Sequence, residues 1–437
     1  MAIGTRDATL RLADFALGLR WQELPQVVVQ RSKELFLDFL GVACGGRLAE
    51  SAGPLLRAGA VGEATVVGER ELYPPHYAAL LNGALAHSQD FDDTHREGVL
   101  HPGAPIFAAL LALAEAHHLP GSQFLTAAVA GYEVSGRLGR AHGEAVHARG
   151  FHPTATTGLF GATAAAARLL GLERRVLLDA WGLNLSQAAG SLQFLENGAW
   201  NKRVHVGLAA HNALVALALA AEGVVGAADP FGGRFGYYFS YADGQADLEG
   251  ALADLGQSFE VLRTAIKPYP CCRYNHAVID GLVELAREHG LGPQEVTAVE
   301  VGLPPAGMPL VADPEVPKKA PANVVDAQFS VYFAAVIALL EGGFTWQSYH
   351  RLDDPLVRDL MARVRAYPCP LGELGARVAI ITPTGGRLER EVPLAKGEPE
   401  RPLSWEELLA KFRPWPRRCW APGRATSWCR RWRGWST

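Results

Sequence analysis

Apolar residues recur at helical spacing through most of the first 260 positions. Leu12, Phe15, Ala16 and Leu19 fall on one face of a helix, and Leu35, Phe36, Phe39 and Leu40 repeat the pattern. This spacing predicts two helices within 5–46 and further helices at 76–89, 104–118, 122–140, 157–170, 174–192 and 207–222. Gly, Pro or both interrupt each junction. Apart from a short β-branched run at 64–68, the first part of the chain is predicted to be all-helical.

The pattern changes near residue 260. Residues 296–301 and 376–382 are β-like, and residues 388–392 alternate apolar with charged side chains. Gly385-Gly386 lies between the last two runs and predicts a hairpin. Helical segments at 275–289 and 327–341 complete a smaller α+β unit.

Ser404 and Glu407 then form a capping-box pattern, which predicts a return to helix. The expected fold is mainly α, with a large all-helical domain and a smaller α+β lid domain. The expected boundaries are 1–265 for the helical domain, 266–395 for the lid, and 396–412 for the return to the helical domain.

Residues 413–437 differ from the rest of the chain, because they hold seven Arg, five Trp and no acid. One interpretation is a basic aromatic arm for nucleic acid or membrane. The favoured interpretation is an out-of-frame tail that is not native-like, because composition breaks at one point and no periodic element follows.

The remainder carries 34 Lys and Arg against 45 Asp and Glu, which argues against nucleic acid as a partner. Charged or polar residues interrupt every apolar run, so no membrane span is expected. The first residues carry acids and predict a helix instead of a signal peptide. Six scattered cysteines without a CxxC pair favour a reducing cytoplasm.

The densest polar segment is 82–105, with four carboxylates and three histidines between apolar helical stretches. Asp90 and Thr94 would share a face if this segment were helical, with His87 one turn earlier. Helix caps explain one acid but not this many charged groups. The segment therefore predicts a polar pocket for proton transfer or metal chemistry. The HExxH and EF-hand patterns are absent, and the second metal motif that an aspartate-rich terpenoid synthase needs is also missing.

Three further clusters carry candidate chemistry. His152 stands in a loop before an Ala-rich helix, beside several threonines. Lys202 and Arg203 precede an apolar helix, where cations oppose the helix dipole and favour a role in binding carboxylates. The run from Lys267 to His276 contains two prolines and Arg273, and it lies at the expected domain boundary. P-loop, GxGxxG and GxSxG motifs are absent, which weakens kinase, dehydrogenase and serine hydrolase interpretations.

Taken together, these clusters resemble the MmgE/PrpD family. The resemblance rests on six motifs in order between about residues 5 and 412: LDFLGVACGG at 37–46, NGALAHSQDFDDTH at 82–95, HPGAPIFAALLALAE at 101–115, GFHPTATTGLFGATAAAARLLGL at 150–172, KRVHVGLAA at 202–210 and KPYPCCRYNHAVIDG at 267–281. It implies a helical domain with an α+β lid, a homodimer, a site between the domains, and no cofactor or obligatory metal.

The resemblance also implies which residues act. The family's polar site corresponds to Asp90, Thr94, His101, His152, Lys202 and His276. Tyr332, in DAQFSVYFAA, matches less closely. We expect catalysis by Asp90, His101, His152, Lys202 and His276, and substrate binding by Thr94, Arg203, Lys267, Arg273 and Tyr332.

Family substrates are di- and tricarboxylates, and bond cleavage beside a carboxylate requires positive charge for the developing enediolate. Lys202 and His101 would supply that charge, while His152, Asp90 or His276 would act as the base. The first expectation is a cytoplasmic lyase: a 2-methylcitrate dehydratase-like hydro-lyase of propionate metabolism. A decarboxylase or epimerase of the cis-aconitate or iminodisuccinate type is the alternative, and a non-catalytic family member is the third.

Overall fold

The computed structural model describes residues 2–57 and 62–413, and the Arg- and Trp-rich tail after 413 lies outside the described residues. Helices dominate, which confirms the mainly α class. The longer helices of the first part are α1 Ala2–Gly18, α2 Gln26–Gly46, α4 Pro75–His87, α5 Gly103–Ala116, α6 Gly121–His142, α9 Gly158–Leu170, α10 Arg174–Asn184 and α11 Asn201–Ala221. The shorter ones are α3 Ala52–Arg57, α7 Ala145–Ala148, α8 Pro153–Thr156, α12 Tyr237–Ala242 and α13 Leu248–Ala251.

This part is less purely helical than the sequence predicted. It also contains two short antiparallel ladders, β1 Ala64–Thr65 with β2 Leu72–Tyr73, and β3 Thr94–His95 with β4 Thr264–Ala265. β1 lies within the β-branched run at 64–68, but a two-residue strand gives no periodicity, so no pattern revealed the other three. The second ladder pairs segments about 170 residues apart in the chain, and it shapes the site described below.

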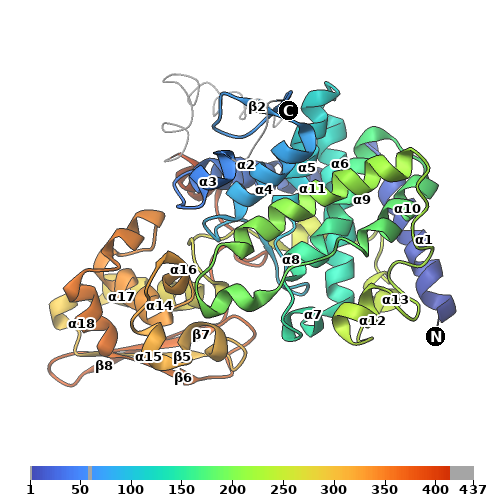
Figure 1. Ribbon diagram of the computed structural model, residues 1–437. Helices are drawn as coiled ribbons and strands as arrows, with labels where there is room; N and C mark the ends of the chain where they lie inside the picture. The colour runs from blue at the N-terminus through green and yellow to red at the C-terminus, as the bar shows by residue number, and fades with distance from the viewer. Residues whose placement is uncertain (1, 58–61, 414–437) are drawn as a thin grey trace.

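The second part holds a four-stranded sheet whose order is β6-β5-β7-β8. Its strands are β5 Ala298–Leu303, β6 Val364–Pro368, β7 Ala376–Ile381 and β8 Arg387–Val392. β5 is parallel to β6 and antiparallel to β7, and β7 pairs antiparallel with β8, which confirms the hairpin. The remaining helices are α14 His276–His289, α15 Glu315–Lys318, α16 Val324–Gln328, α17 Val331–Glu341 and α18 Pro355–Ala362. Figure 1 shows the sheet at one end of the molecule, with α14 and α17 on its inner side.

Short non-α turns connect these elements. They are η1 Trp21–Glu23, η2 Leu192–Glu196, η3 Glu260–Arg263, η4 Arg273–Asn275, η5 Pro293–Glu295, the π-turn η6 Met308–Ala312 and η7 Trp346–Arg351. The sequence predicted helix through residue 192, but α10 ends at Asn184. The reason is that backbone groups near 190 pair with the 150–152 loop: His152 N donates to Gly190 O at 2.8 Å and Leu192 N donates to Gly150 O at 2.9 Å.

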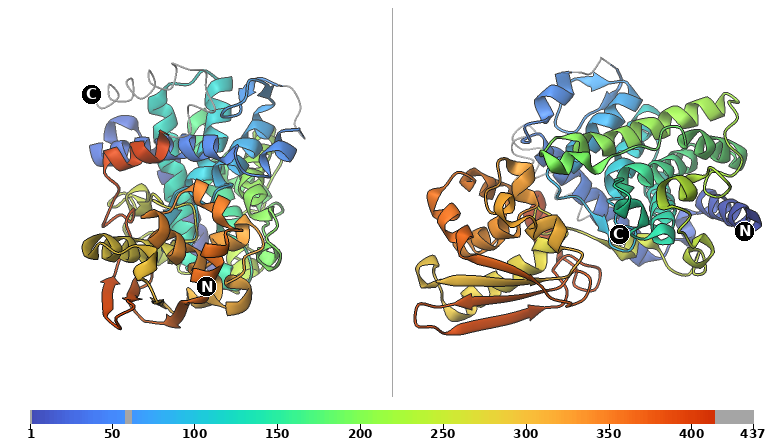
Figure 2. Two further views of the ribbon diagram at one scale, coloured as in Figure 1. Left: turned by 90° about the vertical axis from the view of Figure 1, so that its left-hand side faces the viewer. Right: turned by 60° about the horizontal axis from the view of Figure 1, so that its bottom comes forward.

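Two hydrophobic cores form, one from residues 8–266 and one from residues 271–395. The last helix, α19 Trp405–Phe412, begins at the predicted Ser404 capping box and returns Leu408, Leu409 and Phe412 to the first core. Figure 2 shows α19 lying beside α2. The domain boundaries at 265 and 395 stay predictions.

α4 and α11 approach each other closely, and this contact sets the position of the site. A Cβ on Gly83 would lie 3.0 Å from Gly207 Cα, and one on Gly207 would lie 2.2 Å from Leu80 O. Only glycine permits such backbone proximity. α11 is also the one helix in the described ranges long and apolar enough to cross a membrane by composition, and half of its apolar window is buried within the protein.

Candidate active site

A cavity of about 690 Å³ is lined by residues from both parts of the molecule. The first part contributes Asp90, Thr94, His101, His152 and Lys202, among others. Lys267 and Arg273 follow β4, and the apolar wall includes Leu192, Phe194, Leu310, Phe329 and Leu374. The structure therefore brings together seven of the ten predicted site residues, from segments up to about 180 residues apart.

Asp90 lies at a backbone reversal, not on a helix. α4 ends at His87, and Asp90 adopts φ +51°, a left-handed conformation that Asp tolerates better than most residues. The chain then enters β3, where Thr94 pairs with Ala265 of β4. The segment is therefore not helical, and Asp90 and Thr94 do not share a helix face.

The β3–β4 ladder carries Lys267 to Asp90. Two residues beyond Ala265, the Lys267 ammonium donates to Asp90 O at 2.7 Å and lies 3.1 Å from Asp90 Oδ1. Both side chains are buried. The ammonium thus fixes both the backbone and the carboxylate of the reversal.

Lys202 reaches the same carboxylate from the first turn of α11. Its Nζ donates to Asp90 Oδ1 at 2.6 Å and lies 5.1 Å from the centre of the Phe329 ring. The sequence placed Lys202 before the helix, but α11 begins at Asn201 and includes it. Burial alone would raise the pKa of Asp90, but the two ammonium groups outweigh it and lower that pKa, so Asp90 is an anion held by two cations.

Two imidazoles complete the polar wall. His101 Nε2 lies 3.8 Å from Asp90 Oδ1, and the His101 backbone N–H donates to Thr154 Oγ1 at 3.0 Å. His152 precedes α8, and its ring stacks on His87 at 5.5 Å. Burial lowers the pKa of His101 to about 4, against the opposing effect of Asp92. Burial, with His87 and Lys202, also places the pKa of His152 well below its usual value, so both rings are neutral near pH 7.

Four buried polar atoms of residues that line the cavity have no hydrogen-bond partner within the described residues: Thr94 Oγ1, His101 Nδ1, His152 Nδ1 and Arg273 Nε. Buried polar groups are nearly always satisfied, and each exception calls for an explanation. A ligand with several carboxylate oxygens would supply such a partner.

The other three predicted site residues, Arg203, His276 and Tyr332, are not part of the cavity lining. Arg203 Nη1 donates to Ser51 Oγ at 3.0 Å. His276 is buried, with Nε2 3.2 Å from Cys271 O, and the Tyr332 hydroxyl donates to Ala312 O at 3.2 Å. Each side chain therefore has a partner away from the cavity. Among the residues that do line it, Arg273 is paired with Glu398, which reduces the charge it can offer a ligand.

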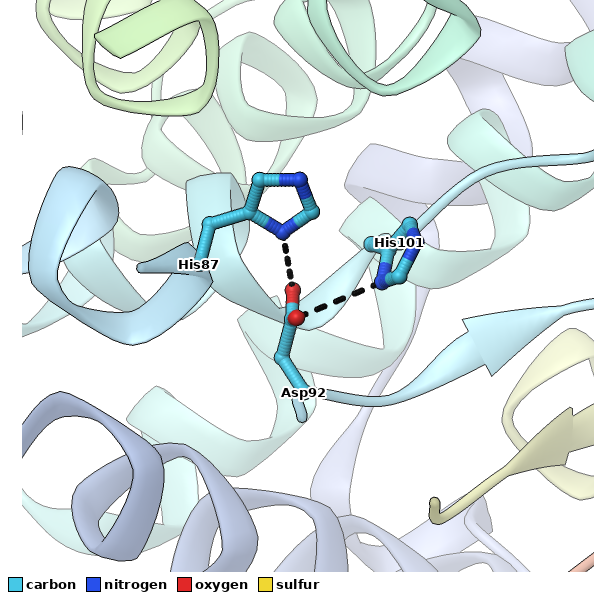
Figure 3. Close-up of side chains that lie close together, drawn as sticks. All are labelled: His87, Asp92 and His101. Atoms are coloured by element: carbon cyan, nitrogen blue, oxygen red, sulfur yellow. Dashed lines mark hydrogen bonds and ion pairs between the residues drawn. The ribbon is translucent and has the colours of Figure 1, made fainter. Parts of the chain in front are cut away.

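Asp92 and His87 form part of the site that sequence analysis did not assign. Figure 3 shows Asp92 between the rings of His87 and His101. The atoms of these three residues that could ligate a metal lie within 4.8 Å of one another. They are the one such set in the described ranges. In the structure they contact each other. The five-residue spacing of His87 and Asp92 across a helix end gave no recognisable signal.

The fold and the cavity define a class: a mainly helical protein with an α+β part, in which lysines and neutral imidazoles surround a buried aspartate. Comparison with known proteins identifies the family of the chain. Residues 10–249 match the MmgE/PrpD N-terminal domain and residues 269–422 match the MmgE/PrpD C-terminal domain, so the chain belongs to the MmgE/PrpD family.

Several relatives are similar over most of their length. Cis-aconitate decarboxylase of Homo sapiens is 29% identical over 91% of this chain and 85% of its own. The cis-aconitate decarboxylase-like protein oryM of Aspergillus oryzae is 28% identical over 93% of this chain and 90% of its own. Cis-aconitate decarboxylase of Mus musculus is 28% identical, over 93% and 86% respectively.

Proposed function

We propose that this protein is a lyase that removes CO₂ from a small unsaturated di- or tricarboxylate of the cis-aconitate type. The observation that carries the proposal is the convergence of Lys202, Lys267, His101 and His152 around Asp90 in one cavity. The names of the three relatives described above support decarboxylation over the other chemistries of the family.

The chemistry needs positive charge and a mobile proton. When the bond between carbon and carboxylate breaks, its electron pair stays on the substrate and spreads into the neighbouring unsaturated acid. Ammonium groups stabilise that charge best where water is excluded. We assign this role to Lys202 and Lys267, whose side chains are largely buried.

The remaining cavity residues bind the substrate and move the proton. Thr94 Oγ1 would donate to a substrate carboxylate, because it has no other partner within the described residues. The neutral ring of His152, with Nδ1 unpartnered in the same sense, would exchange a proton with the substrate carbon. We assign no role in this reaction to Arg203, His276 or Tyr332, because they do not line the cavity.

The 2-methylcitrate hydro-lyase that sequence analysis preferred stays a prediction, as do the homodimer and the cytoplasmic location. None of the three relatives described above bears a dehydratase name. The lysines and histidines around Asp90 would serve both reactions, because elimination of water beside a carboxylate also passes through an enediolate-like state. The two reactions differ in what they release.

Product analysis tests the proposal. The purified chain, dialysed against EDTA, is incubated separately with cis-aconitate, citrate, 2-methylcitrate and iminodisuccinate. We expect CO₂ release from cis-aconitate or a close analogue. Elimination of water from 2-methylcitrate without CO₂ release from any acid would instead identify a hydro-lyase, and turnover that disappears on dialysis would contradict cofactor independence.

Two matched lysine variants separate site chemistry from general effects. Lys202 and Lys319 each place an ammonium about 5 Å from an aromatic ring, but only Lys202 lines the cavity. Lys202→Met should lower turnover by about 10²–10³-fold, the range for losing one electrostatic stabiliser. Lys319→Met should leave it near wild type. Equal rates in both variants would remove Lys202 from the mechanism.

A further inference from the structure

His101 has a carboxylate on each side, and the two carboxylates differ. Its Nδ1 lies 3.3 Å from Asp92 Oδ1, and its Nε2 lies 3.8 Å from Asp90 Oδ1. The Asp92 carboxylate also contacts His87, with His87 Nδ1 2.8 Å from Asp92 Oδ2. The rings of His87 and His101 meet edge to face, with centroids 4.6 Å apart. Figure 3 shows both rings directed at one carboxylate. Asp92 is buried and does not line the cavity, so it acts only through other residues.

His101 Nδ1 and Asp92 Oδ1 depend on each other. Both atoms are buried, and within the described part of the chain neither has a hydrogen-bond partner with good geometry. An unsatisfied buried polar atom costs about 1–3 kcal/mol. At 3.3 Å these atoms need only a small ring rotation to pair. An imidazole N–H facing a carboxylate oxygen satisfies both atoms at once.

The position of the ring proton follows from charge. Asp90 is already neutralised by the ammonium groups of Lys202 and Lys267. In the described structure the ionisable partners within contact of the Asp92 carboxylate are the two imidazoles. A neutral His101 has a single ring N–H, and the less compensated carboxylate attracts it more strongly.

We propose that Asp92, supported by His87, is a positioning residue that holds His101 in the Nδ1–H tautomer, so that a bare Nε2 faces the cavity, where it takes a proton from solvent and passes it to the substrate carbon that CO₂ leaves. This assignment rests on the proposed lyase function for its catalytic meaning. It changes the role expected from the sequence, in which His101 stabilised the enediolate, because a neutral Nε2 without hydrogen cannot donate to an oxyanion.

The same three residues suggest a metal site as the competing explanation. A metal would need bare acceptor atoms about 2.0–2.2 Å from the ion. The 2.8 Å contact between His87 Nδ1 and Asp92 Oδ2 instead has the length of a hydrogen bond with a proton between the atoms. The length of this contact favours the hydrogen-bonded arrangement.

Nitrogen chemical shifts of the imidazole rings test the tautomer without any substrate. In ¹⁵N-histidine-labelled full-length protein at pH 7.5, His101, assigned with a His101→Gln variant, should show a protonated Nδ1 and a bare Nε2. In Asp92→Asn the amide can donate to Nδ1, so the proton should move to Nε2. Asp93→Asn is the matched control, since the neighbouring Asp93 binds Gly103 and Tyr132 instead of an imidazole.

A kinetic measurement follows on the acid that the wild type turns over best. Asp92→Asn should lower kcat by about 10²–10⁴-fold, the contribution of a well-placed group that transfers a proton, while KM changes little. A wild type that releases no CO₂ from any acid would defeat the proposed function and leave the tautomer measurement intact. The inference is overturned if wild-type His101 is protonated at Nε2, if Asp92→Asn leaves the tautomer unchanged, or if Zn²⁺ raises Tm in the wild type and not in Asp92→Asn.

Discussion

Asp93 shows how burial sets the chemistry of one residue. Burial raises its pKa to about 8, although hydrogen bonds from Tyr132 and Gly103 oppose the shift. Because the folded carboxyl keeps its proton to about pH 8 and the unfolded one loses it near 3.8, folding stability falls as pH rises across that window.

Asp93→Asn should therefore match the wild type in stability near pH 4 and exceed it increasingly toward pH 8, because Asn imitates a neutral carboxyl. Thermal melts of both proteins between pH 4 and 9 measure the difference. Asp93→Ala is the control and should be about 1–3 kcal/mol less stable than Asp93→Asn at every pH, because it does not titrate and leaves buried donors unpaired. A difference between Asn and wild type that does not depend on pH would show that Asp93 is ionised in the fold.

For single residues, the sequence indicated which segment carries the charged groups but not which of their atoms are in contact. The count of acids and histidines in 82–105 predicted a buried polar pocket, and Asp90 and His101 line one. Asp92 and Asp93 are adjacent in sequence, yet one pairs with imidazoles and the other with Tyr132 and Gly103. Which partner each carboxylate meets depends on packing, which no local pattern encodes.

Among the elements, α19 contacts the segment that carries Asp90 and Asp92. Lys411 donates to Phe91 O at 2.7 Å, forms an ion pair with Asp38, and lies 4.0 Å from the centre of the Phe91 ring. Phe91 stands between Asp90 and Asp92, so the last described helix fixes the backbone of the reversal that carries both carboxylates.

Lys411→Met should destabilise the protein by about 3–5 kcal/mol, because it leaves Asp38 as an unpaired buried charge. Adding Asp38→Asn should recover part of the loss, since the charge is then removed. Differential scanning calorimetry of both variants measures this, with exposed Glu406→Gln on the same helix as a control near wild type. If the double variant is no more stable than Lys411→Met, the ion pair is not the cause.

Element prediction succeeded where a pattern ran long enough and failed where distant contacts decided. The helix at 275–289, the β7–β8 hairpin and the Ser404 cap followed from period, turn residues and capping chemistry. The predicted helix at 327–341 is divided into α16 and α17 because Ser330 caps a new helix by accepting from Phe333 N. The β3–β4 ladder was missed, although it is what delivers Lys267.

For the whole molecule, the two hydrophobic cores are joined by two chain crossings that lie side by side. Ile266 N donates to Gly397 O at 3.0 Å, which pairs the outgoing segment with the returning one directly beside Lys267. The change of pattern near 260 predicted that the chain leaves the helical part there, but it could not show that the two crossings bind each other. The sequence has no signal for a single backbone hydrogen bond between segments about 130 residues apart.

Gly397 is the residue that this pairing requires, and its replacement tests how the crossings position the cavity. It adopts φ +89°, and a Cβ there would lie 2.1 Å from Ile266 O. Gly385 in the β7–β8 turn has φ +80° but no atom within 4 Å of its Cβ position, so it isolates the conformational cost of about 1–2 kcal/mol.

Gly397→Ala should lower Tm clearly more than Gly385→Ala does, because it adds a backbone clash to the same strain. It should also weaken binding of citrate, used as a polycarboxylate probe in calorimetry, by about tenfold or more, equivalent to roughly 1.4 kcal/mol. The reason is that a shift of Ile266 moves Lys267 away from Asp90. Equal melting temperatures for the two variants would mean that the crossings move without cost. Citrate affinity in folded Gly397→Ala that matches Gly385→Ala would mean that they do not set the cavity.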